Sequence, residues 1–400
     1  MIAFGRYLQL LRVPGIGRAA AASLPGRLPI GMASLALLLY VQKQSGSFAH
    51  AGTIAACYVL GLGVFAPILG RGIDRFGPRP ILTASVVVYP LALLTLMALA
   101  VAQAQMSWIV ICALLAGALL PPITICMRSL FPRLLSDPSQ LQMAYALDSV
   151  LIEMVFILGP TLVAVFVVIG HPAGAVLLSA ACGGLGSLLF LRTPAIQSWE
   201  PSAHAAHRNL LGPLHERQLR KLLVITLLYA ASFGLFEVAV TAFAVKQGMP
   251  GAAGVILALA SAGSALGALI YGGQSWRLSL PSQLWRALLL MAGGILLLVP
   301  VSSVYLFGAL CIAACMPMAP VIATQSILVS HIAPRALLAE SFTWAASCLL
   351  AGISGGIAAA GLLVELWSPS AVLMLAAAMA GLAALLAWAI LPADLAEQIS

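Results

Sequence analysis

The sequence predicts an all-α membrane protein with twelve transmembrane helices. Of its 400 residues, 62% are hydrophobic and only 8% are charged, whereas soluble domains contain about 25% charged residues. A helical span needs about 20 apolar residues. Twelve such runs follow one another along the chain, with one long polar segment in the middle. This composition excludes a water-soluble globular protein.

The twelve apolar runs fall into two groups of six. They lie at about residues 19–41, 49–70, 81–103, 107–129, 145–168, 173–192, 222–245, 252–273, 284–301, 303–326, 340–364 and 369–391. The polar segment 193–221 is interpreted as a linker between residues 1–192 and 222–400, each forming a six-helix bundle. Residues 31–43 align without a gap to residues 234–246, which indicates an internal repeat and predicts two bundles related by pseudo-two-fold symmetry.

Basic residues predict the orientation of the chain. If the loops are assigned alternately to the two sides, lysines and arginines gather on one side, while the other side has only Lys43 and Lys246. By the positive-inside rule, both termini and the linker are expected to be cytoplasmic in a multi-pass protein of the inner membrane. The net charge of +8 is thus explained by topology. Nucleic-acid binding is not expected, because the basic residues do not form one solvated patch.

A charged segment joins the second and third spans. It contains Gly70, Asp74, Arg75, Gly77 and Arg79 in the pattern Gly-x-x-x-Asp-Arg-x-Gly-x-Arg. We expect the second span to leave the membrane at Gly70 and the chain to reverse at Gly77. The pattern and its position resemble the signature loop of the major facilitator superfamily of secondary transporters.

This resemblance implies two bundles around a central cavity and transport by alternating access. In the resembled family, the loop docks on the start of the eleventh span and latches the outward-facing state, so Asp74 would cap that span. Glu340 opens the eleventh span, where a carboxylate is favoured by the helix N-terminus and where Arg71 or Arg75 could reach it.

Three ionisable residues lie well inside the predicted spans, where they need a partner or a cavity. Arg27 in the first span and Glu153 in the fifth are at similar depth and could pair. Glu237 lies near Phe233 and Phe236 on the seventh span, which lines the cavity in the resembled fold. Burial penalises its ionised form, so Glu237 is a candidate proton carrier. The alternative is a neutral carboxyl group that forms a helix–helix hydrogen bond.

Two further groups of residues are interpreted as structural. Asp148 and Arg128 are expected to pair across a short loop. Cys311, Cys315 and Met318 share one face of the tenth span and could bind Cu(I), but core packing is favoured because Cys and Met are common in buried apolar helices. No metal site or cofactor is expected. The sequence contains no HExxH, CxxC or Walker-type motif, so neither an enzyme nor an ATP-driven pump is favoured.

These observations predict a secondary active transporter that moves a small amphipathic molecule by alternating access. Proton-coupled efflux is the preferred function. The alternatives are proton-coupled uptake of a small metabolite and a transport-inactive scaffold or sensor with the same fold. The expected partners are the substrate, protons and the lipid bilayer, and the chain is expected to be a monomer.

Overall fold

The computed structural model describes residues 4–46, 48–200, 212–249, 252–366 and 368–391, and these residues form helices without any strand. The first six spans are α2 (Ile16–Ser45), α3 (Phe48–Phe76), α4 (Pro78–Val101), the pair α5 (Met106–Ala118) and α6 (Ile123–Leu134), α7 (Pro138–Val168) and α8 (Pro172–Leu191). The last six are α10 (Arg217–Lys246), α11 (Ala252–Gly272), α12 (Leu280–Leu298), the pair α13 (Val304–Cys315) and α14 (Met318–Ile332), α15 (Leu338–Leu366) and α16 (Pro369–Ile390). Four short helices complete the fold: α1 (Phe4–Arg12), α9 (Pro194–Gln197), η1 (Gly212–His215) and η2 (Arg335–Leu337).

The predicted number of spans is confirmed: the described residues contain twelve helical segments that are long and apolar enough to cross a membrane. Two of them are not continuous helices, however. The predicted spans 107–129 and 303–326 are each broken, the first at Pro121 and Pro122 and the second at Pro317. Proline has no N–H to donate and its ring clashes with the preceding turn, so it interrupts the ladder of helical hydrogen bonds.

The predicted linker 193–221 lies only partly within the described residues, since 201–211 are outside them. Its described ends contain α9 and η1, and α10 already begins at Arg217 rather than at residue 222. The exact bounds of the two bundles therefore stay a prediction.

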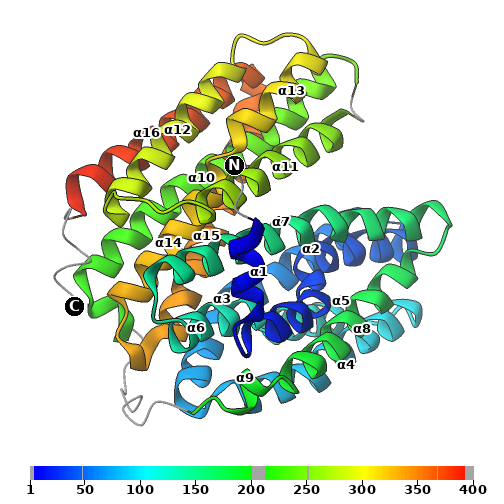
Figure 1. Cartoon of the computed structure of the whole chain (residues 1–400). Coiled ribbons are helices and arrows are strands. Elements are labelled where there is room, and N and C mark those ends of the chain that lie inside the picture. The colour runs from blue at the N-terminus through cyan, green and yellow to red at the C-terminus, as the bar shows by residue number, and fades with distance from the viewer. Residues whose placement is uncertain (1–3, 47, 201–211, 250–251, 367, 392–400) are drawn as a thin grey trace.

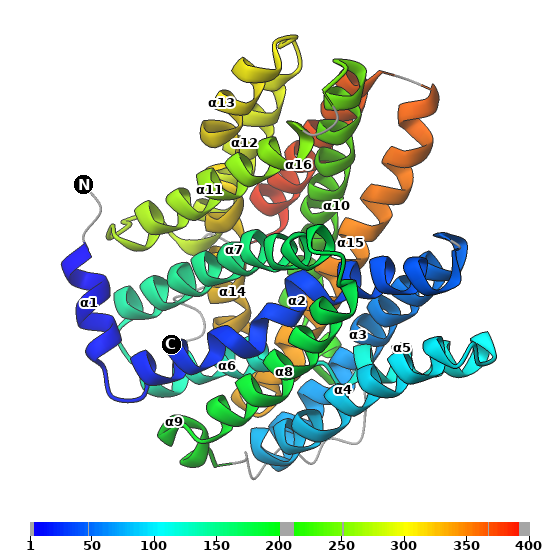
Figure 2. The ribbon, with the colours of Figure 1, turned by 90° about the vertical axis from the view of Figure 1, so that its right-hand side faces the viewer.

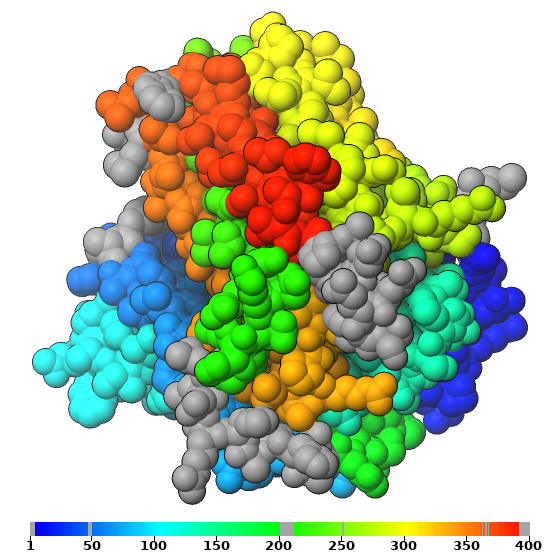
Figure 3. Space-filling model, turned by 90° about the vertical axis from the view of Figure 1, so that its left-hand side faces the viewer, coloured from blue at the N-terminus to red at the C-terminus, as the bar shows by residue number. Residues whose placement is uncertain are grey.

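The two bundles meet at one end and spread apart at the other (Figures 1 and 2). We call the first the basic end, where Arg75, Arg79 and Arg133 lie, and the second the far end, where Lys43 and Lys246 lie. In Figure 1 the basic end is on the left, and the bundles diverge towards the right. Seen from the basic end, atoms of both bundles lie side by side (Figure 3).

Polar contacts join the bundles at the basic end. The hydroxyl of Tyr7 in α1 donates to the carbonyl of Leu269 in α11 at 2.9 Å. Gln142 at the start of α7 donates through Nε2 to the carbonyl of Tyr271 at 3.0 Å. Because both acceptors lie in the last turn of α11, these bonds hold the first bundle to the basic end of the second.

Glycines allow close helix crossings inside each bundle, at equivalent spans. In the first bundle α2 crosses α7 at Gly31, and a Cβ on Gly159 would lie 2.7 Å from the Gly31 carbonyl carbon. In the second bundle α10 crosses α15 at Gly234, and a Cβ on Gly356 would collide with the carbonyl oxygen of Ala231. Gly31 and Gly234 are the residues aligned by the internal repeat, so the repeat corresponds to one packing arrangement used twice.

Candidate functional site

Asp74 connects the two bundles at the basic end. Its side chain is only 2% exposed. Its Oδ1 accepts a hydrogen bond from the backbone N–H of Ala339 at 3.0 Å, and its Oδ2 accepts one from that of Glu340 at 2.8 Å. These N–H groups belong to the first turn of α15, where they have no partner within the helix. A carboxylate from the first bundle therefore caps a helix of the second, which is the contact that the resemblance implies.

The position of Asp74 corrects one prediction. We expected the second span to end at Gly70, but α3 continues as a helix to Phe76. The reversal needs only Gly77, whose φ of +80° favours glycine, and α4 begins directly at Pro78. The two extra turns of helix carry Asp74 to the start of α15.

The other residues of the charged segment differ in their surroundings. Gly70 packs against α15, since a Cβ there would lie 2.6 Å from Cγ2 of Thr343. Arg75 and Arg79 are exposed, and the guanidinium of Arg75 lies 5.0 Å from the centre of the Phe76 ring. Glu340 is buried. Of Arg71 and Arg75, it is Arg71 that has an electrostatic interaction with the Glu340 carboxylate.

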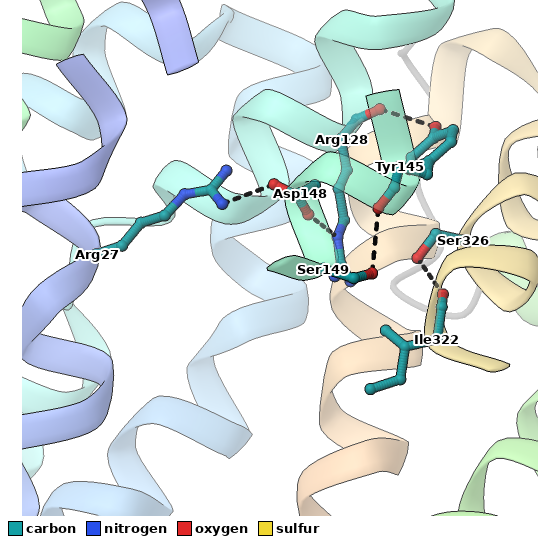
Figure 4. A network of polar contacts seen from close by, with 7 residues as sticks. All are labelled: Arg27, Arg128, Tyr145, Asp148, Ser149, Ile322 and Ser326. Atoms are coloured by element: carbon teal, nitrogen blue, oxygen red, sulfur yellow. Dashed lines mark hydrogen bonds and ion pairs between the residues drawn. The ribbon is translucent and has the colours of Figure 1, made fainter. Parts of the chain in front are cut away.

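A buried cluster of ion pairs lies inside the first bundle (Figure 4). Asp148 on α7 contacts Nη1 of Arg27 through Oδ1 at 2.6 Å and accepts from Nε of Arg128 through Oδ2 at 2.7 Å. Arg27 and Asp148 are 0% and 1% exposed. Tyr145 donates to the carbonyl of Arg128 at 3.0 Å and so holds α6 against α7. The predicted contact between Asp148 and Arg128 is confirmed.

The predicted pair of Arg27 with Glu153 is wrong. Glu153 lies five positions after Asp148, so at 3.6 residues per turn their side chains leave α7 in different directions. Asp148 faces Arg27 on α2, whereas Oε1 of Glu153 accepts a hydrogen bond from Ser264 on α11 at 2.7 Å. Similar depth in the membrane is not sufficient for a contact, because the helix face decides whether Asp148 or Glu153 meets Arg27.

A cavity of about 580 Å³ lies between the bundles. One wall is α7, and the other consists of α10, α11 and Met318 of α14. It brings together four of the five predicted substrate and proton residues, namely Glu153, Phe233, Phe236 and Glu237, whereas Arg27 does not line it. The remaining lining residues are Phe156, Ile157, Pro160, Thr161, Ala164, Gly254, Leu257, Ala258, Ala260, Ser261, Ser264 and Met318.

The two carboxylates of the cavity have different surroundings. Glu153 is held by the Ser264 hydroxyl, as described above. The Glu237 side chain is exposed towards the cavity, and within the described part of the chain no residue forms a hydrogen bond or ion pair with its carboxylate. Only its backbone carbonyl is engaged, by the Thr241 hydroxyl at 2.9 Å. Of the two cavity carboxylates, Glu237 is thus the one that no other described side chain engages.

Cys311 and Cys315 are both fully buried and are not joined in a disulfide. Met318, the third residue of that candidate copper face, is in α14 beyond the proline break and lines the cavity. Among the described residues there is no group of three or more His, Cys, Asp or Glu side chains arranged to hold a metal ion. Packing remains the interpretation of the two cysteines.

Two helical bundles, with twelve segments long and apolar enough to cross a membrane among the described residues, define a multi-pass membrane protein. The sequence profile of the Major Facilitator Superfamily matches residues 20–337. The chain belongs to this superfamily, whose members are transporters rather than enzymes.

Relatives and solved structures agree with this assignment. An uncharacterized MFS-type transporter, y4rN, of Sinorhizobium fredii (strain NBRC 101917 / NGR234) is 28% identical over 277 residues, which are 66% of this chain and 68% of the relative. The fold is similar to that of a bacterial homologue of the iron transporter ferroportin in an outward-facing state, with TM-score 0.76, 14% identity and coverage of 93% and 98%. It is also similar to the human organic anion transporter MFSD10, with TM-score 0.72, 17% identity and coverage of 94% and 100%. The proton:xylose symporter XylE gives TM-score 0.66, 13% identity and coverage of 96% and 99%.

Proposed function

We propose that this protein exports a small amphipathic molecule across the inner membrane in exchange for protons, by alternating access. The observation that carries the proposal is the cavity between the bundles, which contains a carboxylate from each of them, Glu153 and Glu237, among apolar and aromatic side chains. The structural neighbours are described as a bacterial homologue of the iron transporter ferroportin, a human organic anion transporter and a proton:xylose symporter. These proteins differ too much in what they carry for any one substrate to be assigned to this chain, so the proposal rests on the cavity itself.

In this proposal the basic end faces the cytoplasm, as the positive-inside rule predicts, and both termini lie on that side. With this orientation, the joined basic end and the spread far end support a state that is open to the outside. Transport requires the basic end to open in turn.

The conformational latch of the proposal consists of Gly70, Asp74, Arg75, Gly77, Arg79 and Glu340. Asp74 is its central residue, because its two hydrogen bonds to α15 cross from one bundle to the other. Gly70 lets α3 approach α15 closely, and Gly77 allows the turn that places Asp74. Opening of the basic end must break both bonds of Asp74, so the latch favours the outward-facing state.

Proton coupling is assigned to Glu237. A carboxyl group without a protein partner, in a largely apolar cavity, can take up a proton without breaking an ion pair. Glu153 keeps its hydrogen bond to Ser264. Arg27 has no part in the cavity, because its charge is engaged by Asp148.

The experiment begins with a growth screen, in which a strain that overexpresses the protein is exposed to toxic amphipathic compounds. Compounds to which it becomes resistant are then added to liposomes that contain the purified protein and a pH-sensitive dye. We expect substrate-dependent proton flux from the wild type. We expect Glu237→Gln to lose this flux while it still exchanges substrate for substrate.

Glu216→Gln is the matched control. Glu216 lies just before α10 and accepts a hydrogen bond from the N–H of Gln218, so it is a carboxylate next to the same helix but outside the cavity. Full proton coupling in Glu237→Gln would overturn the assignment of the proton carrier. Proton flux that accompanies uptake would reverse the direction, and no flux with any compound of the screen would favour the scaffold or sensor.

A further inference from the structure

The charges of the cavity restrict its ligand. Its lining contains two acidic residues, Glu153 and Glu237, and no lysine, arginine or histidine. Arg27 and Arg128, the cations near this part of α7, contact Asp148 and do not line the cavity. An anion in the cavity would face carboxylates without a basic partner, whereas a cation would be attracted to them.

Aromatic rings accompany each carboxylate. On α7, Phe156 follows Glu153 by three residues, and on α10, Phe233 and Phe236 precede Glu237 by four and one. All of these residues line the cavity. Residues three or four apart share a helix face, so Phe156 stands beside Glu153 and Phe233 beside Glu237. The faces of aromatic rings attract cations, so each wall offers a negative charge next to a cation-binding apolar surface.

The remaining lining does not fit an inorganic cation. Calcium takes six to eight oxygen ligands and magnesium requires a near-octahedral set. Soft metals prefer thiolate, thioether or imidazole ligands. Here the two carboxylates are accompanied by three hydroxyl groups, one thioether and otherwise apolar side chains. Within the described residues no group of three or more His, Cys, Asp or Glu side chains is arranged around a common point.

We propose that the cavity binds a lipophilic organic cation whose positive charge is held by Glu153 and Glu237 and whose rings pack on Phe156, Phe233 and Phe236. The volume of about 580 Å³ lies within the range of about 300–1,000 Å³ that holds drug-sized ligands. The two carboxylates belong to different bundles, so one bound cation contacts both bodies that move during alternating access. This inference names the substrate class of the proposed transporter and rests on that proposed function.

The test compares two ions of the same shape and opposite charge, tetraphenylphosphonium and tetraphenylborate. Equilibrium binding of each radiolabelled ion to the purified protein in detergent is measured for the wild type and for Glu153→Gln, Glu237→Gln and the double variant. Protein-free detergent micelles correct for the ions that partition into detergent. We expect the wild type to bind the phosphonium at least tenfold more tightly than the borate. We expect each single variant to weaken phosphonium binding about tenfold and the double variant to abolish it.

Glu216→Gln again serves as the control and should bind the phosphonium like the wild type. Size-exclusion chromatography checks that every variant is folded, and Glu237→Asp, which keeps the charge, should recover part of the binding. Equal or tighter binding of the borate, failure of the phosphonium to bind, or undiminished binding by the double variant would each overturn the inference. Displacement of the phosphonium by micromolar Mn²⁺ would also overturn it, in favour of a metal site.

The measurement needs neither a proton gradient nor transport. Carboxylate-dependent phosphonium binding without proton flux in liposomes would refute proton coupling and keep the cation site. Proton-coupled flux of neutral compounds without phosphonium binding would support proton coupling and refute the cation site.

Discussion

Replacement of Asp74 by asparagine tests the contact that closes the basic end. The carboxylate accepts two backbone N–H groups of α15 while it is 2% exposed. A hydrogen bond to a charged group contributes about 1.5–3 kcal/mol, and a neutral one about 1 kcal/mol. Asparagine keeps one acceptor but turns its amide nitrogen towards the second N–H, so only one neutral bond remains. The closed basic end therefore loses roughly 2–5 kcal/mol, which shifts its opening equilibrium by a factor of about 30 to 4,000.

Hydrogen–deuterium exchange with mass spectrometry measures this shift where it arises, in peptides that cover the start of α15. Exchange there should speed up by the same factor in Asp74→Asn, and transport should fall far more than expression does. Asp137→Asn is the matched control, because Asp137 accepts the N–H of Ser139 at 2.9 Å and caps α7 inside the first bundle. Unchanged exchange at α15 in Asp74→Asn, or an equal increase in Asp137→Asn, would refute the reasoning.

Three further substitutions have distinct expected outcomes. Asp148→Asn leaves the fully buried Arg27 without its carboxylate, which should cost about 3–5 kcal/mol; a large drop in folded yield and melting temperature is expected, and yield equal to the wild type would contradict the ion pair. Gly159→Val places side-chain atoms against the α2 backbone and should prevent folding, whereas Gly293→Val enters open space and should be tolerated; similar melting temperatures for the two variants would argue against the crossing. Gly77→Ala strains a turn whose φ of +80° and ψ of 170° are adopted almost only by glycine, at a cost of about 1–3 kcal/mol, so we expect a loss of thermal stability, and an unchanged melting temperature would show that the turn relaxes.

Hydropathy predicts the twelve spans because each must cross the same apolar thickness, but it does not predict where each helix ends. Helix α3 continues through Arg71, Asp74 and Arg75, since a charged residue can leave the lipid without leaving the helix. The breaks at Pro121 and Pro317 were open to prediction from proline chemistry, yet the apolar runs around them appear continuous.

Only the part of the candidate site that lies on one helix could be predicted from the sequence. Phe233, Phe236 and Glu237 form one local pattern on one helix, and they line the cavity together. Which residues on different helices meet depends on how each helix is rotated about its axis. The depth of a residue in the membrane does not give this rotation. Asp148 was therefore missed as the partner of Arg27, although its spacing of five residues from Glu153 shows that only one of the two can face α2.

The ion pair of Arg27 also has a consequence for biosynthesis. Arg27 is in the first span to be made, and its partner Asp148 is in the fifth. An arginine at the centre of a lone helix costs about 2.5–3.5 kcal/mol during insertion, and this cost is not offset until the ribosome has completed α7. The first helix thus enters the membrane with its arginine unpaired, and a nascent chain that stops before α7 keeps that arginine unpaired.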